Sequence, residues 1–270
     1  YDLKSAKRSL NLLFADWANR GLNRWTIEQV SLPLVTSIAD YPAGILTMTV
    51  AASGSFTAGE TITGGTSGAT ASITSITSST VIAITIPSGT FVATETITGG
   101  TSSATTTVTA AVSFGNVRST IDILSAVVRQ NAGTANQSDI AISRISRDTF
   151  INIPSKNTTA RPSQFYIDRQ ITPILKLWST PDSTNYTLVF DRLVRIDDAD
   201  NPQNTLGVPF RFYPCLSAGL AYYISLKKAP ERVQLLKAVY EEEFERAAAE
   251  DRDRASLTLT PSRDYYTFIR

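Results

Sequence analysis

The sequence predicts an α+β protein: a helical bundle joined to an antiparallel β part that carries an inserted small all-β domain. Apolar residues recur at helical spacing in residues 2–20 and again in 208–254. Short runs of β-branched and aromatic residues, separated by turn residues, occupy much of 121–195. Residues 42–117 differ from the rest, because they contain only two charges in 76 positions and repeat themselves.

The N-terminal helix of this bundle is predicted over residues 2–20, with Asp2 as its cap and Gly21 at its end. Three basic residues, Lys4, Lys7 and Arg8, lie off its apolar stripe. They could bind phosphate, but a solvated helix face is the simpler interpretation. The stripe itself consists of Leu3, Ala6, Leu10, Leu13, Phe14 and Trp17.

The C-terminal run is predicted to form two helices that meet at Ala229-Pro230, because proline disfavours helical geometry in the residue before it. The first contains fourteen uncharged residues, 213–226, too few to span a bilayer, so we expect protein to cover it on most sides. The second carries the ion pair Glu242/Arg246 on its polar face. Its apolar face consists of Val233, Leu236, Tyr240, Phe244 and Ala247.

The repeated segment matches residues 54–74 to 89–109 at an offset of 35 residues. Each unit predicts a short strand, a Gly-Gly turn that permits positive φ, and a second strand of β-branched residues. Two units are too few for a solenoid, so we expect a compact β-domain at 44–118. It would be inserted into a core made of 1–43 and 119–256, since insertions cost little when their ends lie close together.

The residue types limit the chemistry available to this chain. Histidine is absent, which removes histidine general acid–base catalysis, Ser-His-Asp nucleophiles and histidine metal sites. Cys215 lies in the uncharged helix and is interpreted as a small buried hydrophobe. The acidic run at 197–200 is interpreted as a surface loop rather than a calcium site. We therefore expect no cofactor, no metal and no enzymatic activity.

Glu60 and Glu95 are the only charges in 42–117, and each occurs once per repeat. They could form the carboxylate pair of a tail-associated cell-wall hydrolase, which needs two carboxylates in one cleft. Solvated positions beside the turns of a duplicated hairpin are the simpler interpretation. A further alternative is that the inserted β-domain binds a carbohydrate or host receptor.

Six segments carry a resemblance to a known family, and they occur in the order AKRSLNLLFADWANRGLNRWTIEQ, ISRISRDTFINIPSK, RPSQFYIDRQ, LKLWSTPDS, YTLVFDRLVRI and VPFRFYPCLSAGLAYYISLKKAPERV. This series resembles the head-to-tail adaptor (connector or tail accessory) proteins of short-tailed bacteriophages. The resemblance covers about residues 5–43 and 119–257. It implies a subunit of a twelve-membered ring below the portal protein, which continues the DNA channel and receives the tail nozzle or tail tube.

The resemblance also implies a location in the virion, at the head–tail interface, after assembly in the host cytoplasm and without a membrane partner. A net charge of +1 suits a conduit through which double-stranded DNA slides, because tight phosphate binding would hold the DNA. Candidates for the ring or channel surface are Lys4, Lys7, Arg8, Glu242 and Arg246.

Residues 257–270 are expected to form an extended C-terminal arm that contacts the portal. Strand-forming and aromatic residues there suit docking by strand addition or into a groove. The predicted portal-contact residues are Leu257, Leu259, Tyr265, Tyr266, Phe268, Ile269 and Arg270.

Overall fold

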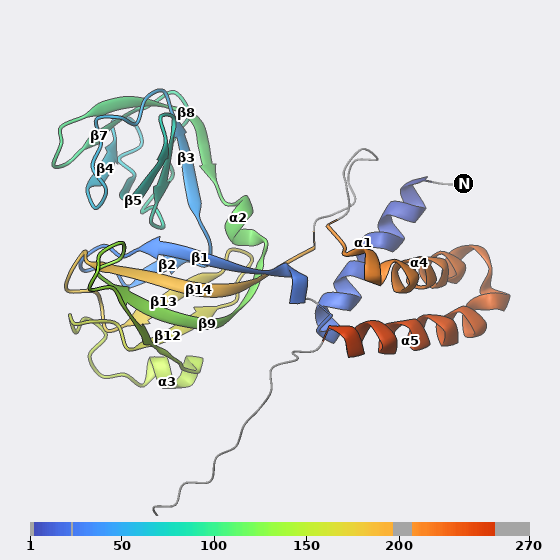
Figure 1. Ribbon diagram of the computed structural model, residues 1–270. Helices are drawn as coiled ribbons and strands as arrows, with labels where there is room; N and C mark the ends of the chain where they lie inside the picture. The colour runs from blue at the N-terminus through green and yellow to red at the C-terminus, as the bar shows by residue number, and fades with distance from the viewer. Residues whose placement is uncertain (1–2, 23, 197–206, 252–270) are drawn as a thin grey trace, which may run out of the picture. The chain divides into compact units, whose positions relative to one another are not determined.

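The computed structural model describes residues 3–22, 24–196 and 207–251. It confirms a mixed α+β protein, with helices and several β-sheets (Figure 1). The chain divides into two compact units, which we call the helical unit (residues 1–25 and 196–270) and the β unit (26–195). The predicted portal-contact residues 257–270 lie outside the described residues.

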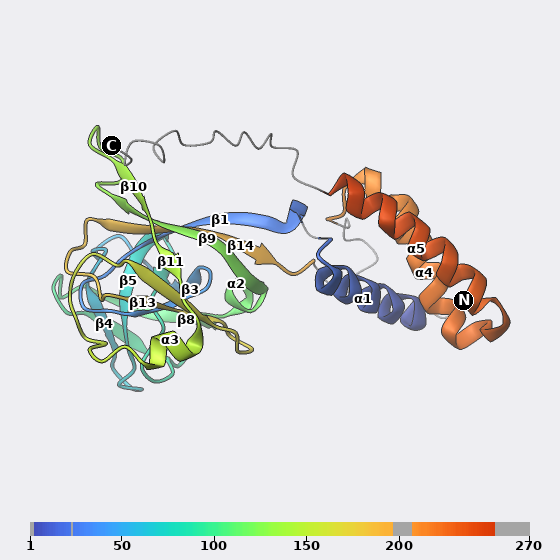
Figure 2. The ribbon, with the colours of Figure 1, turned by 90° about the horizontal axis from the view of Figure 1, so that it is seen from below.

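The helical unit contains α1 (Leu3–Arg20), α4 (Tyr213–Lys228) and α5 (Val233–Glu250). A short 3-10 turn, Pro230–Arg232, separates α4 from α5, which confirms the predicted break at proline. Both α1 and α5 contact α4 (Figure 2). Their shared core includes Leu13, Phe14, Trp17, Leu22, Ile196, Val208, Phe212, Cys215, Tyr240, Phe244 and Ala247.

Two four-stranded sheets of the β unit enclose one hydrophobic core, to which β1, β2, β9, β12, β13 and β14 all contribute. The first sheet, in spatial order, consists of β1 (Ile27–Pro33), β14 (Tyr186–Val194), β9 (Thr120–Gln130) and β10 (Ser138–Ala141). The second consists of β11 (Ser143–Arg144), β12 (Gln164–Asp168), β13 (Ile174–Trp178) and β2 (Asp40–Pro42). All pairings are antiparallel except β11 with β12. The short helix α3 (Arg147–Ile151) starts after Ser146, whose side-chain oxygen accepts a hydrogen bond from the N–H of Thr149.

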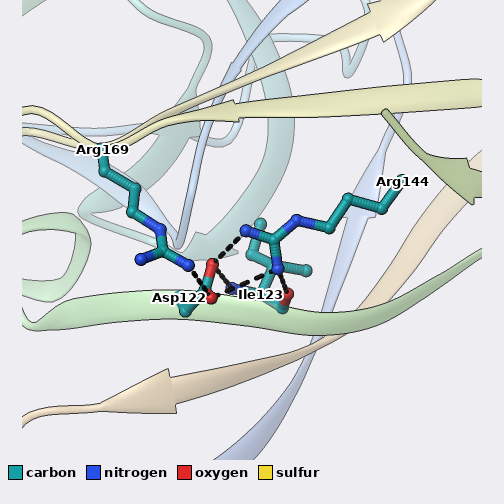
Figure 3. Close-up of polar contacts among 4 residues, drawn as sticks. All are labelled: Asp122, Ile123, Arg144 and Arg169. Carbon is teal, nitrogen blue, oxygen red and sulfur yellow. Dashed lines mark hydrogen bonds and ion pairs between the residues drawn. The ribbon is translucent and has the colours of Figure 1, made fainter. Parts of the chain in front are cut away.

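One carboxylate links these two sheets (Figure 3). Asp122 on β9 accepts hydrogen bonds from Arg144, with Nη2 to Oδ1 at 2.9 Å, and from Arg169. Arg144 also donates to the carbonyl oxygen of Ile123 at 3.1 Å. Because Arg144 lies on β11 and Arg169 follows β12, the cluster holds an edge of the second sheet to the first.

The repeated segment forms a closed six-stranded barrel (Figure 1). The hairpin β4–β5 comes from the first repeat and β7–β8 from the second, and β4 pairs with β7. That pairing joins Thr63 to Thr98, its equivalent in the other repeat, so the two hairpins are related by a local two-fold axis. Around the barrel the strands are β3 (Leu46–Val50), β6 (Val81–Ile84), β5 (Thr70–Ser78), β4 (Thr61–Gly64), β7 (Thr96–Gly99) and β8 (Thr105–Ser113).

The first of the two barrel glutamates binds the turn of the other repeat. Glu60 is only 4% exposed. Its Oε2 accepts hydrogen bonds from the backbone N–H groups of Ser102 at 3.0 Å and Thr101 at 3.3 Å, and from the Ser102 hydroxyl at 2.8 Å. Its Oε1 accepts one from the N–H of Thr57 at 2.6 Å. One carboxylate therefore satisfies donors from both halves of the barrel.

Glu95 makes the equivalent bonds in the opposite direction and is also 4% exposed. It accepts hydrogen bonds from the N–H groups of Ser67 at 2.9 Å and Thr66 at 3.3 Å, and from the N–H of Val92 at 2.6 Å. Burial alone would raise the pKa of both glutamates, but the hydrogen bonds to backbone and serine donors outweigh it and lower the pKa of each.

The interpretation of these glutamates as solvated turn residues is therefore wrong. The prediction that the Gly-Gly turns use positive φ is wrong as well. In the first repeat, positive φ occurs at Gly59 and Gly68 instead. A Cβ on Gly64 would lie 2.6 Å from Oε2 of Glu95, and one on Gly99 would lie 2.5 Å from Oε2 of Glu60. These glycines are needed because the incoming carboxylate, together with the serine hydroxyl that donates to it, occupies the space of a side chain.

The chain enters and leaves the barrel at one place. Thr120 on β9 donates its hydroxyl hydrogen to the carbonyl oxygen of Ala43, with 2.5 Å between the oxygens. The buried Arg192 on β14 donates to the same hydroxyl at 3.1 Å and to Glu28 at 2.7 Å. The helix α2 (Gly115–Arg118) stands between β8 and β9. The two ends of the expected insertion, 44–118, thus lie next to each other.

Candidate functional site

The candidate site consists of two exposed surfaces of the helical unit. A polar network holds in place the helices that form these surfaces. The hydroxyl of Tyr240 on α5 donates to Oδ2 of Asp16 on α1 at 2.6 Å. Arg20 donates to Glu241 at 2.5 Å, and its guanidinium carbon lies 3.6 Å from the ring centre of Phe244. Burial, and then the hydrogen bond to Asp16, raises the pKa of Tyr240. These contacts hold α1 against α5.

A single glycine allows α4 to approach both of its neighbours. Gly219 is buried, and a Cβ at this position would lie 2.6 Å from Leu13 on α1 and 2.9 Å from Tyr240 on α5. Cys215, one turn earlier, is also buried, and burial, followed by the charge of Glu243, raises the pKa of its thiol to about 12. The prediction that Cys215 is a buried hydrophobe is confirmed.

The prediction that protein covers α4 on most sides is wrong for the described part of the chain. Only Cys215, Gly219 and Ser225 of this helix are buried. Leu226 is 50% exposed, and Leu12 on α1 is exposed to the same extent. The first half of α1 and the last turns of α4 thus leave apolar side chains open to solvent.

These side chains line a groove of about 730 Å³ between α1 and α4. Its basic members are Arg8, Lys227 and Lys228, and Lys227 donates to the hydroxyl of Ser5 across the groove at 3.2 Å. No acidic residue lines it among the residues that the structure describes. Its apolar members are Leu3, Ala6, Leu12, Tyr223, Ile224 and Leu226.

The second apolar surface is the outer face of α5, defined by Leu235, Val239, Glu242 and Arg246. These residues follow a spacing of four, three and four, which places them on one side of the helix. Leu235 is 69% exposed and Val239 43%, and Arg246 donates to Glu242 at 2.5 Å. Of the predicted apolar face, Tyr240, Phe244 and Ala247 are buried, and Val233 and Leu236 are half-buried. None of the α5 residues lines the groove.

The helices carry opposite charges. In α1, Lys4, Lys7, Arg8 and Arg20 against Asp16 give +3, and α4 adds Lys227 and Lys228 for +2. In α5, five glutamates against Lys237 and Arg246 give −3. A basic groove and an acidic helix therefore belong to the same small unit.

Comparison with models of known families and with curated proteins finds no match. The connector function expected from the resemblance therefore stays a prediction.

Three of the five predicted ring or channel residues belong to one of these two surfaces, and Lys4 and Lys7 belong to neither. Lys4 and Arg8 are exposed on α1, Lys7 is half-buried there, and Arg8 lines the groove. Glu242 and Arg246 pair on the outer face of α5. Sequence reasoning missed Leu12, Leu226, Leu235 and Val239, which supply the apolar part of both surfaces. The signal for Leu12, Leu235 and Val239 was their placement outside the predicted apolar stripes, whereas Leu226 ends the uncharged run 213–226, for which no stripe was predicted.

The described residues offer little for metal or membrane chemistry. They contain no group of three or more Cys, Asp or Glu side chains arranged to hold a metal ion. Among the same residues, no helix combines the length and the hydropathy that a membrane crossing requires. The acidic run 197–200 lies outside the described residues.

Proposed function

We propose that the protein is a structural subunit of a virion, a connector that forms a ring between the portal and the tail nozzle or tail tube. The segments that resemble phage adaptors lie in the helical unit and in the two four-stranded sheets, on either side of the barrel segment in the sequence. In this proposal α1, α4 and α5 form a three-helix bundle, and twelve copies surround a channel through which double-stranded DNA passes.

The observation that carries the proposal is the number of apolar side chains that this bundle leaves exposed. Leu3, Leu12, Tyr213, Leu226 and Leu235 are all at least 44% exposed within one small helical unit. Clusters of exposed apolar residues mark protein interaction surfaces. A subunit that contacts a neighbour on each side, and a further protein above and below, needs several such surfaces.

Electron microscopy of the purified protein, alone and mixed with portal protein, tests this function. We expect closed rings that stack on the portal. The C-terminal arm is tested by truncation after Ala255: the shortened protein should fold, as judged by circular dichroism, and be missing from portal-containing particles. Failure to bind portal by the full chain, or normal incorporation of the truncated chain, would contradict the assignment.

The contacts of the barrel glutamates favour a structural function over hydrolysis. A glycosidase acid needs a raised pKa and a carboxyl group that reaches substrate. Glu60 and Glu95 instead have lowered pKa values and are surrounded by backbone donors. We expect no turnover of peptidoglycan, and activity that disappears when both residues are changed to glutamine would contradict this.

A further inference from the structure

We propose that the groove between α1 and α4 binds the outer face of α5 from a second copy of this chain. The inference deepens the connector proposal. The contact between two copies does not depend on that proposal, and only the closure of the copies into a ring does. It identifies the two surfaces that meet, and it leaves the portal and the tail components aside.

Charge selects the occupant of the groove. Three basic residues, Arg8, Lys227 and Lys228, line it without an acidic one among the described residues. The partner should therefore be acidic, and it should also carry apolar side chains for the apolar lining. The outer face of α5 supplies the apolar side chains Leu235 and Val239, and Glu242 lies one turn beyond Val239. Glu242 pairs with Arg246 on the same face, so the acidic character comes from the helix as a whole, which has a net charge of −3.

The dimensions of the two surfaces agree. The groove follows α1 from Leu3 to Leu12, which is about 14 Å at the rise of an α-helix. Leu235 to Glu242 spans about 10 Å along α5 by the same rise. A helix that docks in a groove inserts residues at this four-then-three spacing. Leu235 and Val239 would fill the apolar part, and Glu242 would reach Lys227 or Lys228 at the rim.

The contact joins two different surfaces, because the groove and the outer face share no residue. Each copy that binds a neighbour through its groove still has its own outer face available. Such a head-to-tail contact repeats until rotation closes a ring, or continues as a filament. Nucleic acid is the other acidic occupant, but the groove offers it apolar side chains in place of further phosphate contacts.

A crossed pair of variants of the full chain tests this arrangement by sedimentation velocity. Leu12→Asp places a carboxylate in the groove, and Val239→Asp places one on the outer face. We expect each variant alone to associate more than tenfold more weakly than the wild type, because a central interface position is lost. Mixed together, they should form a dimer and nothing larger, since one intact groove then meets one intact face.

A second crossed pair changes only exposed charges, which are not needed for folding. Lys228→Glu and Glu242→Lys should each weaken association alone, and their mixture should regain assemblies larger than a dimer, because reversed groove then meets reversed face. The matched control is Ile171→Asp, which removes an exposed apolar side chain from the β unit. Its association should equal that of the wild type, and circular dichroism checks the fold of every variant.

The outcomes separate the contact from the function. A wild-type chain that stays monomeric, association that the groove and face variants leave unchanged, or mixtures that fail to recover would each overturn the contact. Binding of DNA by the wild type that Leu12→Asp abolishes, without self-association, would assign the groove to nucleic acid instead. Head-to-tail assembly without any portal binding would support the contact and contradict the connector function.

Discussion

Replacing Glu60 by glutamine should destabilise the barrel while leaving the helical unit unchanged. The substitution keeps the size of the side chain and removes its charge. A glutamine retains one acceptor oxygen, so its NH₂ group must face N–H donors either at Thr57 or at Thr101 and Ser102. At least one charge-assisted bond is lost, and a donor is left facing another donor.

The expected loss is about 2–4 kcal/mol, because a hydrogen bond to a charged group contributes about 1.5–3 kcal/mol and a buried donor left unsatisfied adds to the cost. Amides of the barrel that exchange through its unfolding should then exchange about 30- to 700-fold faster. By the two-fold relation, Glu95→Gln should have a similar effect.

Hydrogen exchange resolved by mass spectrometry is the suitable assay, since the barrel contains neither tryptophan nor tyrosine to report on its unfolding. Peptides from β4–β5 and β7–β8 report the barrel, and peptides from α5 are the internal reference. Glu245→Gln, on the exposed surface of α5, is the matched control. The reciprocal link is refuted if the barrel amides of Glu60→Gln exchange at the rate found in this control. It is also refuted if exchange becomes faster only in the β4–β5 peptides, which belong to the same repeat as Glu60.

Three further predictions concern pH, helix packing and the contact between sheets. The folded pKa of both barrel glutamates is lowered, so their contribution to stability is complete above their ordinary pKa of ~4.3 and is lost as pH falls below it. After correction for the slower intrinsic exchange in acid, the protection factors of the barrel amides should fall on acidification, and an equal fall in a double glutamine variant would contradict this. Gly219→Ala should lower the stability of the helical unit by about 1–3 kcal/mol in thermal circular dichroism, because the added methyl group overlaps both neighbouring helices. Ser217→Ala, at an exposed position, is the control, and equal melting temperatures of the two variants would refute the close approach. Asp122→Asn should cost about 1 kcal/mol, measured by hydrogen exchange of peptides from β9 and β12, since two partly exposed arginines lose their carboxylate. Unchanged exchange of these peptides would show that the cluster contributes nothing.

The helices were predictable because their apolar residues are periodic. The N-terminal helix was expected over residues 2–20, and α1 spans Leu3–Arg20. The break before Pro230 follows from the local chemistry of proline, which needs no tertiary information. Tyr240, Phe244 and Ala247 lie on the buried face because they recur at helical spacings of four and three. Local patterns thus determine where a helix lies and which face it buries.

The contacts of the barrel glutamates were not predictable from local patterns, because their partners lie in the other repeat. Glu60 binds Ser102, 42 positions away, and a charge beside a turn is ordinarily solvated. The open faces of the helical unit were missed for a related reason. Scattered apolar residues on the polar face of a helix are common, so Leu235 and Val239 did not stand out in the sequence. Only the packed helical unit shows that both side chains stay exposed in the described chain.

The exchange of glutamates between the hairpins determines which mutations the duplicated segment can accumulate. The octapeptide ETITGGTS is identical in the two copies, at 60–67 and 95–102, whereas Gly59 and Gly68 have diverged to Thr94 and Ser103. A side chain at Gly99 would meet Oε2 of Glu60 in the first copy and Oγ of Ser102 in its own hairpin at the same distance, 2.5 Å. Within this octapeptide, a change in one copy therefore alters a contact of the other, whereas positions outside it can differ between the copies.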